Sequence, residues 1–253
     1  FYRTFKINNV LLNYEGIPFQ NYLLKSIKKI NPKIQTLGYL HCAPWPVQTD
    51  LFYKKQKLDK FIVSGNDQKK ILTQFFDWNN KKIFVVPSLR FRKTKEKQFS
   101  GNIFVPYDLT KGNNYIQRFD TFLKNSAKKS LNFFKVRIHP LKKNSNVHKQ
   151  LAEELKKIIK LRKNKFSSKR KNQSIFLGSA TGVCIQALEE GNEIIHFPEN
   201  HYLDTFSDKI WTNINVSKVD KYIYKYNLIK NGQVFITNNR KDNFKKFIEP
   251  HFN

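Results

Sequence analysis

The chain has 253 residues, and its 47 Lys and Arg against 19 Asp and Glu give a formal net charge of +28. Because 40% of the residues are hydrophobic, the composition excludes an intrinsically disordered chain. No apolar run approaches the roughly 20 residues of a membrane-spanning helix. The two cysteines, Cys42 and Cys184, make no disulfide framework and no zinc pattern.

The first third of the chain predicts strands and helices in alternation. Apolar residues from Phe19 to Ile30 recur at helical spacing, and this helix should end before Pro32. A second helix is predicted from Asn66 or Asp67 to about Asp77, and strands with their turns are predicted at 10–16, 34–40, 61–65 and 83–86. Such alternation predicts a parallel sheet whose strands end on one edge, where ligands bind in open α/β sheets.

A second series of elements follows a polar, basic segment at residues 91–101, which lacks periodicity and is predicted to be a linker. Strands are predicted at 102–105, 133–138, 175–177 and 193–197, and helices at about 114–125, at about 148–161 and between the last two strands. From Trp211 onwards we expect shorter helices, including Phe244 to Ile248.

These elements predict an α/β protein of two Rossmann-like domains, each built on a parallel sheet. The first domain would span residues 1–90 and the second residues 102–253, on either side of the linker. Because the chain begins at Phe1 and contains no Met, we expect a fragment or a processed chain whose first domain is incomplete.

The clearest candidate for a binding site is the strand, turn and helix at residues 174–191. The turn is occupied by small and hydroxyl residues, namely Gly178, Ser179, Ala180, Thr181 and Gly182. The first N–H groups of such a helix, together with its dipole, favour an anion at the carboxyl edge of the sheet. The alternative is a turn that only caps its own helix.

His139 and Glu15 also stand where predicted strands end. His139 precedes Pro140, which restricts its backbone to an extended conformation, so the imidazole can donate to a phosphate oxygen or, alternatively, bond a loop carbonyl. Glu15 precedes Gly16, so its carboxylate is placed as a general base for an acceptor hydroxyl. The alternative for Glu15 is an exposed residue of a turn.

An imidazole and an indole, His41 and Trp45, lie in a loop that two prolines make rigid. This pair suits stacking against a sugar, and the alternative is a loop that packs on itself. Asp50, Glu199 and His201 are weaker candidates. The sequence contains no phosphate-binding loop, dinucleotide fingerprint or metal-binding motif.

The excess of basic residues favours partners with negative charge, such as nucleic acid, an anionic membrane or phosphorylated substrates. Most of the excess is Lys and comes with abundant Asn, Ile, Phe and Tyr, so a low-GC coding bias explains it equally well. Motifs in which Arg alternates with aromatic residues, as in the usual RNA-binding folds, are absent from the sequence. Nucleic acid is therefore not the expected partner.

Two segments resemble the surface-carbohydrate biosynthesis proteins of bacteria: residues 14–20 (YEGIPFQ) and 36–41 (TLGYLH). Those proteins belong with GT-B glycosyltransferases of the sialyltransferase and Kdo-transferase type, which carry an acidic-Gly, a His-Pro and a Ser/Thr motif in that order. Here Glu15-Gly16, His139-Pro140 and Ser179-Ala180-Thr181 stand in those places, and the resemblance covers roughly residues 10–205. Tyr14 stands where the sialyltransferase motif commonly has a second acidic residue, and Ser-Ala-Thr replaces its paired serines.

The resemblance implies a transferase, independent of metal and cofactor, that moves a sugar from a nucleotide donor to a bacterial surface glycan. The implied donor is a CMP-linked ulosonic acid, and lipid-linked glycans are further candidate acceptors. Glu15 would be the catalytic base of the first, acceptor-side domain, with His41 and Trp45 as candidate acceptor or sugar contacts. The second domain would bind the donor through His139-Pro140 and the turn from Gly178 to Gly182.

Two other functions stay open. A polyol-phosphate or glycerophosphate transferase of the teichoic-polymerase type resembles the same group in its His-Pro element, and a non-catalytic basic module would bind RNA or anionic lipid. We expect a cytoplasmic protein, since two cysteines without a disulfide framework suit a reducing compartment. The charge also suits peripheral contact with anionic lipid at the inner face of the cytoplasmic membrane.

Overall fold

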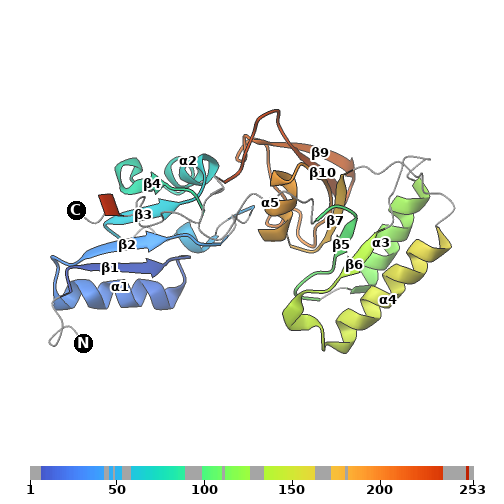
Figure 1. Cartoon of the computed structure of the whole chain (residues 1–253), viewed down its shortest axis with the longest axis horizontal. Coiled ribbons are helices and arrows are strands. Elements are labelled where there is room, and N and C mark those ends of the chain that lie inside the picture. Colours follow the sequence, from blue (N-terminus) through green and yellow to red (C-terminus); the bar gives the residue numbers. More distant parts are fainter. Residues whose placement is uncertain are drawn as a thin grey trace. The chain divides into compact units, whose positions relative to one another are not determined.

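A computed structural model describes the chain as two compact units, Phe1–Lys93 with Ile210–Asn213 and Gln233–Asn253, and Thr94–Lys209 with Ile214–Gly232 (Figure 1). The residues that the structure describes are 7–42, 46–47, 49–52, 58–88, 99–109, 112–125, 134–162, 172–179, 182–235 and 249–250. Each unit has helices and a sheet of its own, so the predicted α/β class is confirmed.

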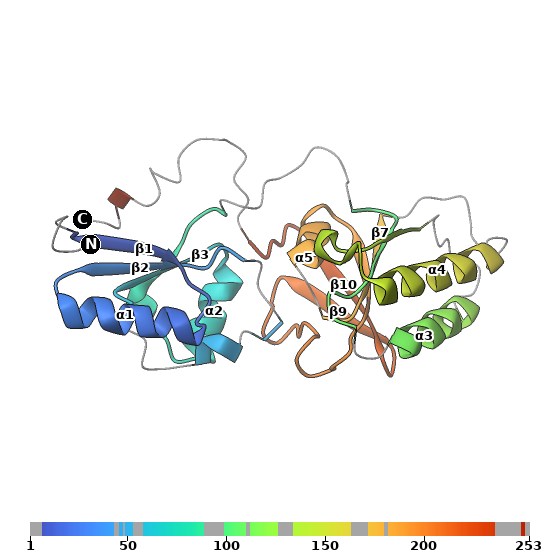
Figure 2. The same ribbon diagram turned by 90° about the horizontal axis from the view of Figure 1, so that it is seen from below.

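The sheet of the first unit has parallel strands in the order β1-β2-β3-β4. The elements of this unit are β1 (Asn9–Asn13), α1 (Pro18–Ile30), β2 (Gln35–Tyr39), the 3₁₀ turn η1 (Thr49–Phe52), β3 (Lys60–Val63), α2 (Asn66–Gln74), the 3₁₀ turn η2 (Asn80–Lys82) and β4 (Ile83–Val85). Helix α1 lies along one face of the sheet and α2 along the other, and the view from below brings α1 to the front (Figures 1 and 2). The predicted elements of this region are therefore present close to their predicted bounds.

Local chemistry explains where α1 begins and ends. Pro18 occupies the first turn, where its missing N–H costs no helical hydrogen bond and its fixed φ fits the helix. The last N–H bonded into the helix belongs to Asn31, which donates to the carbonyl of Ile27 at 3.0 Å. Pro32 follows and disfavours helical backbone before it, so the predicted stop at this point is confirmed.

The short segment Ile210–Asn213, which interrupts the second unit in sequence, and Gln233–Asn253, which follows it, belong to the first unit. The fully buried Trp211 donates its indole N–H to the carbonyl of Pro46 at 3.0 Å. The buried carboxylate of Asp67, in the first turn of α2, accepts from Thr212 at 3.1 Å and from Asn213 at 3.0 Å. The predicted second domain runs without a break to residue 253, whereas these returning segments belong to the first unit.

The sheet of the second unit has the strand order β6-β5-β7-β8-β10-β9. Its elements are β5 (Asn102–Phe104), α3 (Gly112–Asn125), β6 (Lys135–Arg137), the 3₁₀ turn η3 (Pro140–Lys142), α4 (Asn146–Leu161), β7 (Gln173–Leu177), α5 (Gly182–Glu189), β8 (Glu193–Phe197), β9 (Ile214–Asp220) and β10 (Ile223–Leu228). The strands β6, β5, β7 and β8 are parallel, whereas β10 is antiparallel to both β8 and β9.

Two predictions for this unit are wrong. The sheet is mixed and not wholly parallel, and the region after Trp211, predicted to be helical, forms the β9–β10 hairpin. Ile214 and Val216 alternate with polar residues at the start of β9, and this period of two, with β-branched side chains, favours a strand over a helix. The predicted helix at 244–248 lies outside the described residues.

The predicted linker at residues 91–101 lies mostly outside the described residues, and its last part is bonded to the second sheet. The N–H of Gly101 donates to the carbonyl of Gln173 at 2.8 Å, and the carbonyl of Gly101 accepts from Lys135 at 2.8 Å. The carbonyl of Phe99 accepts from the hydroxyl of Ser174 at 2.6 Å. Residues 99–101 are therefore hydrogen-bonded to the second unit just before β5 begins.

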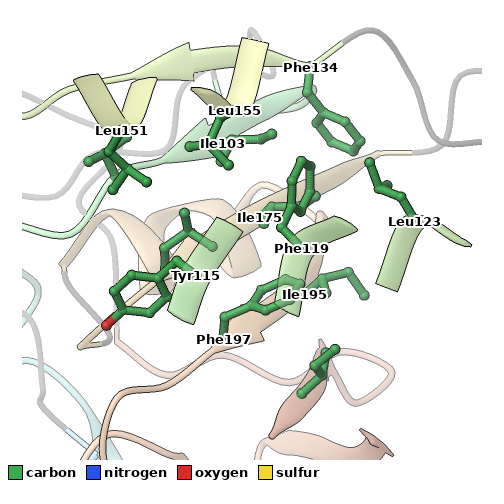
Figure 3. Close-up of a cluster of buried hydrophobic side chains, with 13 residues drawn as sticks. Ile103, Tyr115, Phe119, Leu123, Phe134, Leu151, Leu155, Ile175, Ile195 and Phe197 are labelled. Atoms are coloured by element: carbon green, nitrogen blue, oxygen red, sulfur yellow. The ribbon is translucent and has the colours of Figure 1, made fainter. Parts of the chain in front are cut away.

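The hydrophobic core of the second unit lies between one face of its sheet and the helices α3 and α4 (Figure 3). Buried side chains from the helices meet those of the central strands, among them Tyr115, Phe119, Leu123, Leu151, Leu155, Ile103, Ile175, Ile195 and Phe197. Helix α5 covers the opposite face (Figure 1). Among the helices that the structure describes, none combines the length and the apolar character needed to cross a membrane.

Candidate functional site

In the first unit, Glu15 and His41 meet just beyond the carboxyl ends of two adjacent parallel strands. Glu15 follows β1 and His41 follows β2. The carboxylate Oε1 of Glu15 lies 3.4 Å from Nδ1 of His41, and the two side chains keep 38% and 33% of their exposure. The structure thus brings together two residues that were predicted separately. Trp45, predicted beside His41, lies outside the described residues.

The contact between Glu15 and His41 is an ion pair when the imidazole is protonated. Its geometry is not that of a hydrogen bond, and Nδ1 of His41 has no hydrogen-bond partner among the described residues. An imidazole nitrogen and a carboxylate oxygen at this separation can share a proton after a small movement of either side chain. The pair is therefore suited to acid–base chemistry on a ligand at the edge of the sheet.

The turn after β1 explains why Glu15 is held at this edge. Gly16 has a φ of +86°, and a Cβ at this position would lie 2.3 Å from the carbonyl oxygen of Asp50. The backbone N–H groups of Glu15 and Gly16 both donate to the side-chain oxygen of Gln20, at 2.8 and 3.1 Å. The side-chain amide of Asn21 donates to the carbonyl of Gly16 at 2.8 Å. The glycine is required by backbone geometry, and the first turn of α1 fixes the backbone that carries the carboxylate.

In the second unit, the predicted turn lies where the strand order reverses. The strand β5 leads into α3 on one face of the sheet, whereas its neighbour β7 leads into α5 on the other face (Figure 1). In open α/β sheets, ligands bind outside the carboxyl ends of two such strands. Gly178 follows β7 with a φ of +81°, and a Cβ there would lie 2.8 Å from Pro106, which follows β5. The chain segments after the two strands therefore approach closely at this edge.

A buried histidine of β8 holds the Gly178 turn in place. Nε2 of His196 lies 2.6 Å from the carbonyl oxygen of Gly178, and Nδ1 lies 3.0 Å from the hydroxyl of Tyr226. Complete burial lowers the pKa of His196 to about 4, so its ring is neutral at neutral pH. Nε2 then donates to the carbonyl, and Nδ1 accepts from the tyrosine. His196 is not among the predicted site residues, because a histidine inside an apolar strand gives no sign of what it contacts.

Ser179 is engaged by a carboxylate. Its hydroxyl donates to Asp204 at 3.0 Å, and the same carboxylate accepts from the backbone N–H of Asn200 at 2.8 Å. The hydroxyl proton cannot be donated to a second group, and the negative charge of Asp204 disfavours an anion directly beside it. Of the other predicted turn residues, Gly182 begins α5, whereas Ala180 and Thr181 lie outside the described residues.

His139 and Pro140 follow β6, which is separated from β7 by β5. The exposed ring of His139 accepts the backbone N–H of Leu141 at Nδ1, at 3.2 Å. The neutral ring therefore carries its proton on Nε2, so Nε2 is the atom that can donate, to a ligand or to a loop carbonyl. Pro140 begins η3, where a missing N–H costs nothing.

Tyr107 and Lys142 extend this edge and were not predicted. The half-exposed ring of Tyr107, which follows β5, meets the ring of His139 edge-on at 4.9 Å. The ammonium of Lys142 lies 4.3 Å from the centre of the Tyr107 ring and 3.7 Å from the carboxylate of Asp108. An aromatic residue directly after a strand and a proline was the sequence signal for Tyr107. Nothing in the sequence distinguished Lys142 as a site residue from the many other lysines of the chain.

Two weaker candidates, Glu199 and His201, lie in the loop after β8 at the same edge. The rings of Tyr222 and Tyr224 flank His201 at 4.8 and 5.7 Å, and both of its ring nitrogens lack a hydrogen-bond partner among the described residues. Burial, together with the positive charge of Arg118 and nearby lysines, lowers the pKa of His201.

The described side chains form no metal-binding cluster, and the thiol of Cys184 is a core group. Within the described ranges, no three or more His, Cys, Asp or Glu side chains are arranged to hold a metal ion. Cys184 is buried in α5, and burial raises the pKa of its thiol, so it behaves as an apolar core residue. Metal independence therefore stays a prediction.

Comparison with known proteins does not extend these observations, since no family model, curated protein or solved structure matches the chain. The resemblance to GT-B glycosyltransferases stays a prediction that depends on the short motifs at Glu15, His139 and Ser179. The function must therefore be inferred from the geometry at the carboxyl edges of the two sheets.

Proposed function

We propose that this protein is a metal-independent glycosyltransferase, in which the two units serve as the acceptor and donor domains of a GT-B-like enzyme. The observation that carries this proposal is the Glu15–His41 pair, with 3.4 Å between Oε1 and Nδ1. Both side chains keep about a third of their exposure at the edge of a parallel sheet where ligands bind. The location at the ends of two adjacent parallel strands, and not the exposure, distinguishes this pair from an ordinary surface ion pair.

In the proposed reaction, Glu15 is the general base. Its carboxylate takes the proton of the acceptor hydroxyl while the hydroxyl oxygen forms a bond to the anomeric carbon of the donor sugar. The bond between that carbon and the phosphate oxygen breaks, and the nucleotide leaves with the electron pair. The imidazole of His41 lies beside the carboxylate and can take this proton on from Glu15.

The donor phosphate is proposed to bind at the carboxyl edge of the second sheet. Three features support this: the Nε2 proton of the exposed His139, the ammonium of Lys142, and the strand reversal at Gly178. The half-exposed ring of Tyr107 suits stacking against a nucleobase. Since Ser179 already donates to Asp204, backbone N–H groups would contribute more than its hydroxyl. The choice of CMP as the nucleotide depends on the motif resemblance alone.

Glu15→Gln should lower the rate of sugar transfer by about 100- to 10,000-fold, the range of a general base. It should leave nucleotide affinity unchanged, because Glu15 belongs to the first unit. The assay is nucleotide release from a panel of nucleotide sugars, with calorimetric titration of CMP alongside. His41→Asn is the matched control, since it keeps the base and should lose less activity. Full turnover by Glu15→Gln, or loss of its nucleotide binding, would contradict this role.

His139→Ala should weaken nucleotide binding by about 1.5–3 kcal/mol, as expected for the loss of a hydrogen bond to a charged group. His41→Ala removes an imidazole from the other unit and should leave that affinity unchanged. Ser179→Ala should lose less than His139→Ala because its hydroxyl already donates to Asp204. A thermal-shift panel of CMP, CDP, UDP and GDP compounds identifies the nucleotide. Stabilisation by CDP compounds alone would favour the polyol-phosphate transferase, and unchanged CMP affinity in His139→Ala would refute this assignment.

A further inference from the structure

Helix α1 carries an apolar stripe on the side that points away from its sheet. Phe19, Tyr22 and Ile30 keep 70%, 71% and 63% of their exposure, and Leu23 keeps 37%. Their spacing places them along one side of the helix, because residues three, four, seven and eleven positions apart lie on the same face. The opposite side faces the sheet through the fully buried Leu24. The helix is therefore apolar on two sides, only one of which the described part of the first unit covers.

Basic residues border this stripe, which we call the α1 stripe (Phe19, Tyr22, Leu23 and Ile30). Lys25, Lys29 and Lys33 are exposed, and residues 17–33 contain no Asp or Glu. The remaining lysine of the helix, Lys28, turns toward the sheet and pairs with Asp59 at 2.5 Å. The outer surface of α1 thus combines aromatic and aliphatic side chains with positive charges and no negative ones.

Two kinds of partner could cover this surface, a second copy of the chain or a membrane, and the charge distinguishes between them. A second copy of the chain would bring together two molecules of formal net charge +28, which their mutual repulsion disfavours. An anionic membrane attracts the same charge, accepts aromatic rings at the level of the lipid headgroups, and offers phosphates to lysines that extend along the surface. We propose that α1 docks this protein on an anionic membrane, with the α1 stripe inserted into the interface and Lys25 and Lys29 on lipid phosphates.

The position of α1 connects this surface to the candidate base. The first turn of α1 holds the Glu15 backbone through Gln20, so a membrane along α1 would lie close to the carboxylate. A lipid-linked acceptor could then reach Glu15 without leaving the membrane, which is the part of the inference that rests on the proposed function. Docking itself requires no transferase activity, so a failure of the enzymatic assay leaves the binding test unaffected.

The test is flotation of the full chain with vesicles of phosphatidylcholine alone and with vesicles that also contain phosphatidylglycerol. Wild type should bind the anionic vesicles and lose binding as salt rises. Phe19→Ser combined with Tyr22→Ser should lower this binding by at least about tenfold, because two aromatic side chains no longer leave water. Lys25→Gln and Lys29→Gln should each lower it by about fivefold.

Matched controls on the second unit separate a docking face from general properties of the chain. Leu161 and Tyr202 are as exposed as the stripe residues, so Leu161→Ser with Tyr202→Ser should leave binding unchanged. Lys149→Gln with Lys157→Gln on α4 makes the same change in net charge as the α1 pair and should have a much smaller effect.

Three outcomes would overturn the proposal. The first is equal binding of the wild type to neutral and anionic vesicles, and the second is an equal loss in the control variants. The third is self-association in analytical ultracentrifugation that Phe19→Ser with Tyr22→Ser abolishes, which would identify the stripe as a contact between copies. The lysine variants alter exposed side chains only, so they keep the test decisive if the double serine variant fails to fold.

Discussion

Gly16→Ala should lower the free energy of unfolding of the first unit by at least about 3 kcal/mol. At a φ of +86° any residue with a Cβ is strained, and this Cβ would lie 2.3 Å from the carbonyl oxygen of Asp50 and 2.9 Å from the side chain of Leu51. Backbone cannot move aside as a flexible side chain can. All three tryptophans of the chain belong to the first unit, so denaturant unfolding followed by tryptophan fluorescence measures the change.

Gly191→Ala separates backbone strain from the close contact. Gly191 has a comparable φ of +78°, but a Cβ there meets no atom within 4 Å. Its replacement should cost the second unit only about 1 kcal/mol, measured by far-ultraviolet circular dichroism. A loss in Gly16→Ala no larger than that in Gly191→Ala would show that the turn can shift away from Asp50. The turn would then not be the rigid support for Glu15 that is described above.

The second unit should lose about 3 kcal/mol of stability as the pH falls from about 6.5 to about 4, because of His196 alone. Below its ordinary pKa this histidine is protonated in the unfolded chain, whereas burial keeps it neutral in the folded unit down to about pH 4. Unfolding therefore takes up a proton in this interval, and the free energy of unfolding falls with the pH. Asp204 and His201 also act on the ring, with opposite signs and less strongly than burial.

The measurement compares wild type with His196→Gln, whose side chain does not titrate. Urea unfolding followed by circular dichroism across this pH range should show a steeper fall for wild type. Asp120, whose pKa is lowered by hydrogen bonds from Lys124 and Arg162, contributes to both proteins and cancels in the comparison. Tyr226→Phe keeps the titrating ring and should keep the steep fall. Parallel pH profiles for wild type and His196→Gln would disprove the buried neutral histidine.

The spacing of hydrophobic residues predicted most of the fold, because strands and helices alternate along most of the chain and each has its own regular spacing. Helix α1 was predicted from the spacing of Phe19 to Ile30 and the stop at Pro32, both of which are local properties of the sequence. The strand β9 was missed because it lies at the edge of its sheet, where mostly exposed side chains weaken the hydrophobic pattern. Whether a strand pairs parallel or antiparallel with the end of a sheet depends on tertiary contacts, which cannot be predicted from the spacing of hydrophobic residues.

Only those site residues that directly follow a strand could be predicted from the sequence. Glu15 and His41 follow adjacent parallel strands, so their meeting follows from the predicted topology. The partner of Ser179 did not follow, because Asp204 comes from a loop without any regular pattern. The motif alone suggested a free hydroxyl for an anion, whereas the fold places a carboxylate against it. Contacts that join a motif to an irregular loop depend on the whole fold.

The route of the chain through the two units has a consequence for biosynthesis. A ribosome releases the sheet of the first unit early, but Trp211, Thr212 and Asn213, which complete that unit, emerge only after most of the second. Until then, the carboxylate of Asp67 lacks its hydrogen bonds from Thr212 and Asn213. The intervening segment can settle its own core first, since domains generally fold as units during synthesis. The first unit can therefore form its complete set of contacts only after residues 210–213 have been synthesised.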